Sequence, residues 1–401
     1  MNKLLIVFDV SFPFVKGGAQ RRFYEVGKRV SETGVEVDWM TFQSWPGGPI
    51  IENNGIRYLS LGKLPKLYNK SGKRSKVEPI IFFFKFLLNI FQIRKYDTVW
   101  IGQWPMLHLF PAIVFARLFG VKLVVDWWEV WSRENWQSYS FIAGSFGYIL
   151  QSILLRLIVK NSIIVTDSKL ESLRIKDVVK SEAEVYWIPN GIPVDEIGAV
   201  DLEATTKYDI ASLGRLKNHK GLDLLIRAIW ILKERDKYKV TAAIVGDGPE
   251  WDALNLLVKD LGLTEQVRLF GQIEDFEETY EIIKSCKVCA ITTINGGGGN
   301  LTLFEAYGCG LPVIAFSLEE GIDEDLIDDG KTGIFVHSVN AESLADALRD
   351  FLQNPEQIRI MKRYSYQKSL DYGWDRVAEK YSNIIFKVPD RGSVNPTPLG
   401  G

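Results

Sequence analysis

Short runs of β-branched and aliphatic residues alternate with longer stretches of helical period along this chain. Such alternation is typical of a parallel β-sheet whose strands are joined by crossover helices. In the first half the expected strands are Leu4–Phe8, Glu36–Thr41, Thr98–Ile101, Lys122–Asp126 and Ser162–Thr166, with helices such as Ala19–Thr33 and Met106–Phe119 between them. In the second half the expected strands are Tyr208–Leu213, Lys239–Val245, Val267–Phe270, Val288–Thr292, Pro312–Phe316 and Gly333–Val336. The sequence therefore predicts an α/β protein with two doubly wound units.

The length of 401 residues also favours two domains, because one hydrophobic core rarely organises so long a chain. The junction is expected at Ile188–Thr206, where a Pro-Asn-Gly-Ile-Pro turn precedes a polar stretch. We predict an N-terminal domain over residues 1–190, a C-terminal domain over 191–371, a helix at about 372–388 that packs back on the first domain, and a loose tail over 389–401. Ligands of open α/β sheets bind beyond the carboxyl ends of the strands, so the cleft between two such domains is the expected active site.

The composition is that of a soluble globular protein, with 46% apolar and 24% charged residues. The apolar run of five residues before Asp9 is shorter than the hydrophobic region of a signal peptide. The apolar stretch Ile80–Phe91 falls short of the roughly 20 residues that span a membrane. With three cysteines and no export signal, we expect a cytoplasmic protein with reduced thiols and no membrane-spanning helix.

Cys286 and Cys289 have the spacing of a CxxC motif, but no second such pair or histidine pair completes a zinc site. Burial at the start of the expected strand Val288–Thr292 is their predicted role. The acidic clusters at 323–325 and 328–329 are expected to form solvated turns. No metal or other cofactor is predicted.

The net charge of −2 conceals an asymmetry, because residues 1–200 hold 25 Lys and Arg against 18 Asp and Glu, and the remainder holds 23 against 32. Nine of the twelve tryptophans also lie in the first half. A basic half rich in aromatic residues suggests contact with something anionic. We expect the two halves to have different tasks, and we expect no nucleic-acid partner.

The strongest motif is the glycine-rich stretch from Asn295 to Val313, which reads as loop, helix, glycine stop and strand. Glycines such as Gly298 and Gly299 let the backbone approach a diphosphate without Cβ clashes. A helix that begins near Asn300 offers free amides and the positive end of its dipole to the same group. The residues predicted to hold a nucleotide here are Gly298, Gly299, Asn300, Leu301, Thr302 and, one turn further on, Glu305 through the ribose hydroxyls.

A second motif joins a strand end, a basic loop and an amphipathic helix over Leu213–Ala228. Arg215 and Lys220 stand where the strand opens toward the expected site. Two cations beside a diphosphate neutralise the charge that grows as it leaves a sugar carbon. A solvated basic turn is the alternative when this motif is taken alone.

A third motif, Val245–Glu250, also runs from a strand toward a helix and contains Gly246 and Gly248. It lacks the third glycine of a dinucleotide fingerprint, because Trp251 occupies that place, and the first strand of the chain has no such fingerprint either. An NAD enzyme is therefore disfavoured. The two glycines are expected either to wall the pocket for the base or to form a tight turn.

Together with Gly17 and Gly18 before the first helix and Pro189-Asn190-Gly191 at the hinge, these motifs resemble retaining glycosyltransferases of the GT-B fold, gathered in glycosyltransferase family 4. The resemblance covers nearly the whole chain. It implies two Rossmann-like domains facing across a cleft, with the nucleotide-sugar donor in the C-terminal domain, the acceptor in the N-terminal domain, and retention at the anomeric carbon. Arg215 and Lys220 match the family's diphosphate-binding pair, Glu305 its ribose-binding carboxylate, and Gly17 and Gly18 a loop that approaches the phosphates.

Two departures from the family pattern concern the sugar end of the donor. The first glutamate of the Glu-x7-Glu motif would fall on Gly297. Where the family often has a histidine after the fourth strand, this chain has Asp126, two tryptophans and Glu129. We expect Asp126 or Glu129 to contact sugar hydroxyls or the acceptor, and the alternative is that these residues only pack in the fold. His108, His219 and His337 match no family histidine and are expected to be structural or exposed.

The stretch from Lys63 to Phe91 suggests contact with a membrane surface. It has six basic and no acidic residues between Lys63 and Lys76, followed by a Phe-rich helix. A basic loop beside a broad apolar helix face is found in helices that dock on anionic membranes. The alternative is that the helix packs on the N-terminal sheet.

The expected function is transfer of a sugar from a nucleotide-diphosphate sugar to a hydroxyl acceptor, such as a glycan, a lipid-linked sugar or a polyprenyl carrier at the inner face of the membrane. The predicted catalytic residues are Arg215, Lys220, Asp126 and Glu129. The alternatives are a nucleotide-sugar epimerase of similar fold and a non-catalytic subunit that binds a nucleotide sugar.

Overall fold

The structure, a computed structural model, describes residues 2–67, 75, 77–180, 183, 185–198, 206–295, 301–318 and 321–386. The chain divides into two compact units, here called the first and the second unit. The first comprises residues 1–126, 157–163 and 378–401, and the second comprises 127–156 and 164–377. The predicted domain limits at 190 and 371 stay predictions.

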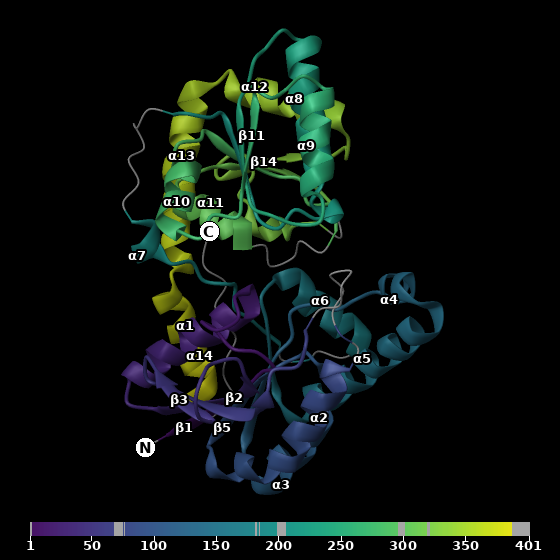
Figure 1. Cartoon of the computed structure of the whole chain (residues 1–401), viewed down its shortest axis with the longest axis vertical. Coiled ribbons are helices and arrows are strands. Elements are labelled where there is room, and N and C mark those ends of the chain that lie inside the picture. Colours follow the sequence, from purple (N-terminus) through teal and green to yellow (C-terminus); the bar gives the residue numbers. More distant parts are fainter. Residues whose placement is uncertain are drawn as a thin grey trace. The chain divides into compact units, whose positions relative to one another are not determined.

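An eight-stranded sheet has the order β3-β4-β2-β1-β5-β6-β7-β8. Strands β1, β2, β3 and β5 of this sheet are labelled in Figure 1. Strand β1 lies between β2 and β5 and is parallel to both, so that Leu4 pairs with Val37 on one side and Thr98 on the other. The strands of this first sheet and the helices between them are, in chain order, β1 (Lys3–Val7), α1 (Gly18–Glu32), β2 (Glu36–Gln43), β3 (Ile50–Asn53), β4 (Ile56–Lys63), α2 (Glu78–Asn89), η1 (Ile90–Lys95), β5 (Thr98–Gly102), η2 (Met106–His108), α3 (Leu109–Phe119), β6 (Lys122–Asp126), α4 (Arg133–Tyr139), α5 (Phe141–Asn161), β7 (Ile163–Thr166), α6 (Lys169–Val179) and β8 (Val185–Trp187).

The sequence analysis missed three strands of this sheet, β3, β4 and β8. Strands β3 and β4 form an antiparallel hairpin around Asn54 and Gly55, which have φ angles of 50° and 75°. An Asn-Gly pair between two apolar runs is a strong hairpin signal, since both positions need positive φ. The strands were predicted from longer apolar runs between helical stretches, and the short Asn-Gly signal was not used.

A second, six-stranded sheet has the order β11-β10-β9-β12-β13-β14, and its neighbouring strands are parallel. All six strands predicted for the second half are present. The elements are α7 (Val194–Ile197), β9 (Ile210–Leu213), η3 (Asn218–Lys220), α8 (Leu222–Glu234), β10 (Ala242–Val245), α9 (Trp251–Asp260), β11 (Val267–Gly271), α10 (Phe276–Lys284), β12 (Val288–Ile291), α11 (Leu301–Gly308), β13 (Val313–Phe316), η4 (Glu324–Leu326), β14 (Gly333–Val336), α12 (Ala341–Leu352), α13 (Pro355–Ser369), η5 (Leu370–Tyr372) and α14 (Trp374–Phe386).

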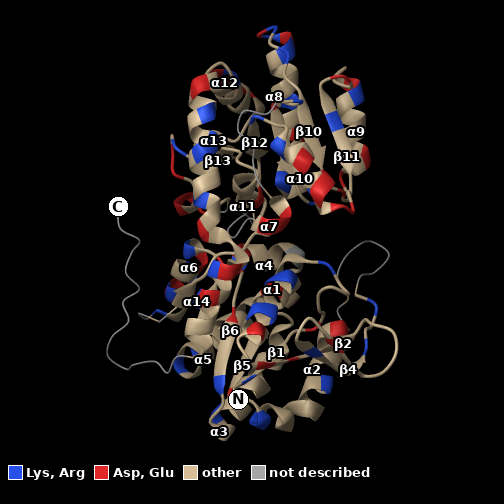
Figure 2. Ribbon diagram, turned by 90° about the vertical axis from the view of Figure 1, so that its left-hand side faces the viewer, with Lys and Arg blue, Asp and Glu red and all other residues tan. Residues whose placement is uncertain are grey.

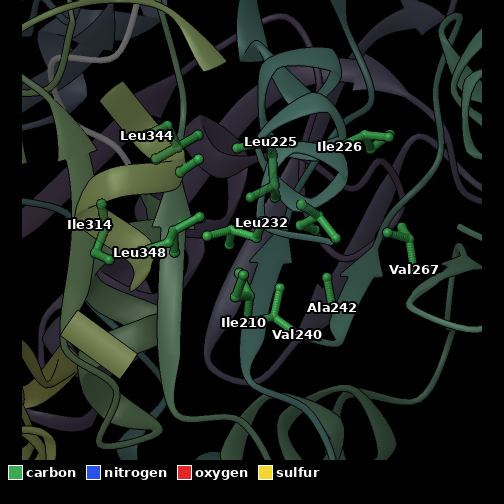
Figure 3. Close-up of a cluster of buried hydrophobic side chains, with 14 of the residues drawn as sticks. Ile210, Leu225, Ile226, Leu232, Val240, Ala242, Val267, Ile314, Leu344 and Leu348 are labelled. Carbon is green, nitrogen blue, oxygen red and sulfur yellow. The ribbon is translucent and has the colours of Figure 1, made fainter. Parts of the chain in front are cut away.

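Both faces of the second sheet are covered, because successive residues of its strands enter different cores. Ala242 and Ile244 of β10 join one cluster, in which α8 and α12 supply Leu232 and Leu348 (Figure 3). Ala243 joins the other cluster with residues of α10 and α11. Each fully buried Leu or Ile side chain contributes about 1.5–3 kcal/mol to the hydrophobic stabilisation. This packing fixes the carboxyl ends of β9, β10 and β12, where the predicted site lies.

The final helix lies against the first sheet. The Lys122 ammonium donates to the carbonyl of Ile384, and the Thr98 hydroxyl donates to that of Ile385. The Tyr381 ring packs on Trp100 with centroids 4.6 Å apart. These are the contacts expected of a C-terminal helix that packs back on the first domain.

Candidate functional site

The loop after β9 begins the candidate site in the second unit. Gly214 has a φ of 122°, which favours glycine, and its amide donates to the Val245 carbonyl over 3.0 Å. Leu216 is 1% exposed and donates to the Asp247 carbonyl. The buried Leu216 holds the loop down, while Arg215 between these two anchors is exposed to solvent.

Gly246 and Gly248 have a structural reason to be glycines. A Cβ atom on Gly246 would lie 1.9 Å from the Gly214 carbonyl oxygen, and one on Gly248 would lie 2.2 Å from that of Leu216. The loops after β9 and β10 therefore touch backbone to backbone. This close approach is a steric reason for glycine at both positions, and the two roles expected for them stay predictions.

Lys220 ends the basic loop in a half-buried position beside the end of β12. Its ammonium donates to the Thr293 hydroxyl over 3.5 Å, and its carbonyl accepts from the Thr292 hydroxyl over 2.7 Å. Gly221 follows with a φ of 60°, and a Cβ there would lie 2.4 Å from the Thr292 carbonyl oxygen. The chain is thus folded tightly around this lysine.

The electrostatic surroundings of Lys220 are cationic. Burial lowers the pKa of the Lys220 ammonium, and the nearby Lys217 lowers it further. Burial also lowers the pKa of His219, and repulsion from Lys220 and Lys217 adds to the effect. Among the described residues, no carboxylate forms an ion pair with Lys220. A bound anion would relieve both the desolvation and the repulsion.

The first residues of α11 lie at the same edge of the sheet. The Thr302 hydroxyl donates to the Leu213 carbonyl over 3.2 Å, which holds the start of this helix against the end of β9. Free amides and the dipole of a helix N-terminus attract anions. Gly297, Gly298, Gly299 and Asn300 lie outside the described residues, so their predicted roles stay predictions.

A small cavity of about 20 Å³, room for roughly one water molecule, gathers these elements at the carboxyl ends of β9, β10 and β12. Its polar lining is Ser212, Gly214, Arg215, Lys220, Thr292, Thr293 and Thr302. The structure thus brings together three of the predicted residues, Arg215, Lys220 and Thr302. The sequence analysis missed Thr292 and Thr293, although two hydroxyl residues after an apolar strand were a readable signal.

Glu305 lies one turn further along α11 and is half-buried. Its carboxylate accepts a hydrogen bond of 3.4 Å from the hydroxyl of Tyr280, which is 1% exposed. That contact steadies the carboxylate near the start of the helix. Its predicted bonds to a ribose stay a prediction.

Asp126 is the last residue of β6, and its predicted contact with a sugar or the acceptor stays a prediction. The carboxylate is completely buried in the first unit, where it accepts from Arg22 Nε over 3.2 Å and from the Tyr381 hydroxyl over 2.8 Å. Burial raises the pKa of Tyr381 well above its usual value. In this structure the Asp126 side chain offers no surface to a sugar, and its visible role is to tie α1 and α14 to β6.

Glu129 is exposed on the loop that follows β6. The Trp131 indole N–H donates to its carboxylate over 2.8 Å, and the Trp127 indole N–H donates to its backbone carbonyl over 3.0 Å. The carboxylate is therefore held in one place and accessible. Of the two acidic residues predicted to reach a sugar, Glu129 is the exposed one, and its contact with a sugar stays a prediction.

Gly17 and Gly18 precede α1 in the first unit and are exposed. A Cβ on Gly18 would meet no atom within 4 Å, so nothing in the unit itself requires glycine there. The Gly17 carbonyl accepts from the Arg21 amide at the start of α1. Their predicted approach to the phosphates stays a prediction.

Cys286 and Cys289 are buried free thiols, as expected from their place at the start of a strand, and Cys309 is also buried and free. Burial raises the pKa of Cys286 to about 12 and also raises that of Cys289. In the part of the chain that is described, no group of His, Cys, Asp and Glu side chains could hold a metal ion.

Comparison with known proteins gives three findings. Residues 194–368 match the family described as "Glycosyl transferases group 1". An uncharacterized glycosyltransferase of Haemophilus influenzae is 28% identical over 176 residues, which are 44% of this chain and 48% of that protein. A GDP-mannose-dependent alpha-(1-6)-phosphatidylinositol monomannoside mannosyltransferase of Mycolicibacterium smegmatis is 29% identical over 281 residues, 66% of this chain and 69% of that protein. The matches span about half the length of several of the curated relatives.

Among solved structures, a sucrose-phosphate synthase of Thermosynechococcus elongatus superposes with a TM-score of 0.77 at 18% identity, covering 96% of this chain and 98% of that one. At this identity the likeness concerns the fold, and it confirms the predicted GT-B architecture of two α/β sheets. The matched family segment contains Arg215, Lys220, Gly246, Gly248, Thr302 and Glu305.

Proposed function

We propose that this chain, whose residues 194–368 match the group 1 glycosyl transferases, transfers a sugar from a nucleoside-diphosphate sugar to a hydroxyl acceptor. The observation that carries the proposal is Lys220. A half-buried ammonium with a lowered pKa and no carboxylate partner among the described residues suits an anionic ligand. The donor's diphosphate supplies that charge at the strand edge where such folds bind ligands.

In the proposed mechanism the diphosphate lies against the start of α11, with Lys220 on the inner side and Arg215 on the solvent side. The bond between the anomeric carbon and the diphosphate oxygen breaks, and the two cations stabilise the negative charge that develops on the leaving group. The acceptor oxygen forms its bond on the face that the diphosphate leaves, and its proton passes to the diphosphate. This retention follows from the resemblance to the family.

The acceptor side of the proposal rests on the residues after β6. Glu129, exposed and held by Trp131, is proposed to accept hydrogen bonds from sugar or acceptor hydroxyls. The resemblance to the family implies a sugar contact at Gly297, which has no side chain to make it, so that contact is absent or is made by another residue. Glu129 has the carboxylate and the exposure for that task.

We further propose a lipid-linked acceptor, used at the inner face of the membrane by a cytoplasmic protein. Helix α2 packs on the first unit through Phe82 and Phe86, which are fully buried, and keeps a line of exposed side chains that includes Phe84 and Leu88. Twelve basic and two acidic residues occur between positions 53 and 125. Both alternatives for this helix are therefore compatible, because one face packs and the other suits an anionic membrane. The mycobacterial relative acts on a phosphatidylinositol mannoside, which agrees with a lipid acceptor.

A transfer assay with UDP-, GDP- and ADP-sugars tests the proposal. Replacing Lys220 by Ala should lower kcat by about 10²–10³-fold, as loss of one preorganised charge-stabilising donor does in other enzymes. The matched control is Lys239→Ala, an exposed lysine ahead of β10. Full activity of Lys220→Ala would contradict the assignment. Epimerised sugar formed without acceptor would indicate the epimerase, and donor binding without turnover would indicate the non-catalytic subunit.

A further inference from the structure

Helix α5 carries a line of exposed apolar side chains that the sequence analysis did not notice. Ile142, Phe146, Ile149, Ile153 and Leu157 are 82%, 65%, 54%, 43% and 37% exposed. Their steps of four, three, four and four residues place them within about 80° of one another around the helix. A line of five large apolar residues in water is unusual for a soluble protein and marks an interaction surface.

The opposite face of α5 is firmly packed. A Cβ on Gly144 would lie 2.0 Å from the Trp136 carbonyl oxygen, and one on Gly147 would lie 2.5 Å from the Trp136 ring. Both glycines therefore let α4 approach the helix closely. Gln151, 1% exposed, accepts from the Trp131 amide over 3.1 Å and donates to the Trp131 carbonyl over 2.9 Å. The exposed line is thus the outer face of a fixed helix.

By length and composition, α5 is the one helix in the described ranges that is long and apolar enough to cross a membrane, which the sequence analysis did not expect. In the structure 39% of its most apolar window is buried against the rest of the protein. The polar contact through Gln151 also ties this helix to Trp131. A helix so attached on one face lies on a bilayer rather than spanning it.

The charges of α5 distinguish a lipid surface from other partners. The segment 141–161 contains no Asp or Glu, and the ribbon of α5 shows no acidic residue (Figure 2). Arg156 and Lys160 continue the apolar line near its C-terminal end, both exposed. Apolar side chains followed by cations match acyl chains bordered by anionic headgroups.

We propose that the outer face of α5 docks on the surface of an anionic phospholipid bilayer. This surface is additional to the one on α2. Ile142 to Leu157 enter the boundary between headgroups and acyl chains, and Arg156 and Lys160 contact lipid phosphates. Binding of α5 to the bilayer does not depend on catalysis. Only the role of this binding, described next, rests on the proposed function.

That purpose follows from the two faces of one helix. Through Gln151 the inner face holds Trp131, and the indole of Trp131 holds the Glu129 carboxylate. Docking the outer face therefore holds the Glu129 loop about one helix diameter, roughly 10 Å, from the bilayer in which a lipid-linked acceptor is presented.

Co-sedimentation of the full chain with vesicles of phosphatidylcholine, with and without phosphatidylglycerol, tests the proposal. Wild type should bind the anionic vesicles. Ile149→Glu should weaken binding by at least about tenfold, because an apolar side chain is lost from the boundary and a negative charge is added. Leu256→Glu, at a residue 58% exposed on α9, is the matched control and should bind as wild type does.

Unchanged binding of Ile149→Glu would overturn the proposal, whether or not Phe84→Glu on α2 weakens binding. Light scattering tests whether the partner of this face is a second copy of the chain. A wild-type dimer that Ile149→Glu converts to a monomer, with vesicle binding unchanged, would also overturn the proposal. A parallel thermal-shift measurement with UDP, GDP and ADP separates the two ideas. If Ile149→Glu loses vesicle binding and keeps nucleotide binding, the result supports the α5 surface and leaves the proposed function unchanged. If the wild type binds no nucleotide, the proposed function fails and the α5 surface is unaffected.

Discussion

Arg22 in the first unit and Lys220 in the second are both cationic side chains near the carboxyl end of a parallel strand, yet their surroundings differ. Arg22 is completely buried and bonds to Asp126 and Tyr381. Lys220 is half-buried among other cations, with a hydroxyl as its partner. A buried charge that is paired serves the fold, whereas one that the fold leaves without an opposite charge is available to a ligand. Arg22 therefore has a structural role, and Lys220 has the surroundings expected of the proposed binding site.

The largest expected effect comes from breaking the paired site. Asp126→Ala leaves the buried Arg22 without its opposite charge and should lower the free energy of unfolding by about 3–5 kcal/mol. Urea denaturation followed by tryptophan fluorescence measures this loss. Asp371→Ala, at an exposed position, is the matched control. If Asp126→Ala instead kept its stability and lost transfer, the comparison would fail and the sugar contact expected from the sequence would return.

His108 extends the comparison to a buried base, because burial favours its neutral form. It packs edge-on against both Phe82 and Phe86, and its Nδ1 bonds to the Pro105 carbonyl. Burial lowers its pKa from 6.5 to about 4. The unfolded chain therefore binds a proton between these values that the folded chain does not.

The contribution of His108 to the free energy of unfolding should therefore be fully present above pH 6.5. It should fall by roughly 3 kcal/mol as the pH approaches 4. Denaturation curves across this range measure the loss. His108→Gln should remove this part of the pH dependence, whereas His337→Gln, at an exposed position, should leave it in place. A dependence unchanged in His108→Gln would mean that other groups cause it.

Arg215 should show the smaller effect of an exposed cation. It lies on the same loop as Lys220 but in solvent, where charge interactions are weakened. Arg215→Ala should lower kcat by about tenfold, less than Lys220→Ala, and added salt should reduce the difference from wild type. A steady-state assay at two salt concentrations measures both. A loss larger than that of Lys220→Ala would reverse the roles proposed for the two cations.

The strands and the glycine positions could be predicted because they depend on local pattern. The apolar runs of β9 to β14 and the glycines at 246 and 248 are visible in the sequence itself. The environment of Asp126 could not be predicted in this way. Its partners Arg22 and Tyr381 are 104 and 255 residues away in the chain. Only the fold brings them together.

Side-chain exposure was the other feature that local pattern did not reveal. Small and polar residues such as Gly147, Gln151 and Ser152 interrupt the apolar composition of α5, and the structure places them on or near its packed face. The exposed line on the other side becomes visible only when burial is known. The same holds for Lys220, whose lack of a carboxylate partner in the described ranges depends on which side chains gather around it.

Titration calorimetry with UDP, GDP and ADP on wild type and Lys220→Met tests the central claim most directly. The account predicts that at least one of these nucleotides binds wild type and that Lys220→Met weakens its affinity by about 10- to 100-fold, the loss of one charge-assisted contact. Asp371→Ala should bind as wild type does. Equal affinity of wild type and Lys220→Met for the nucleotide would contradict the claim that Lys220 awaits the donor's diphosphate.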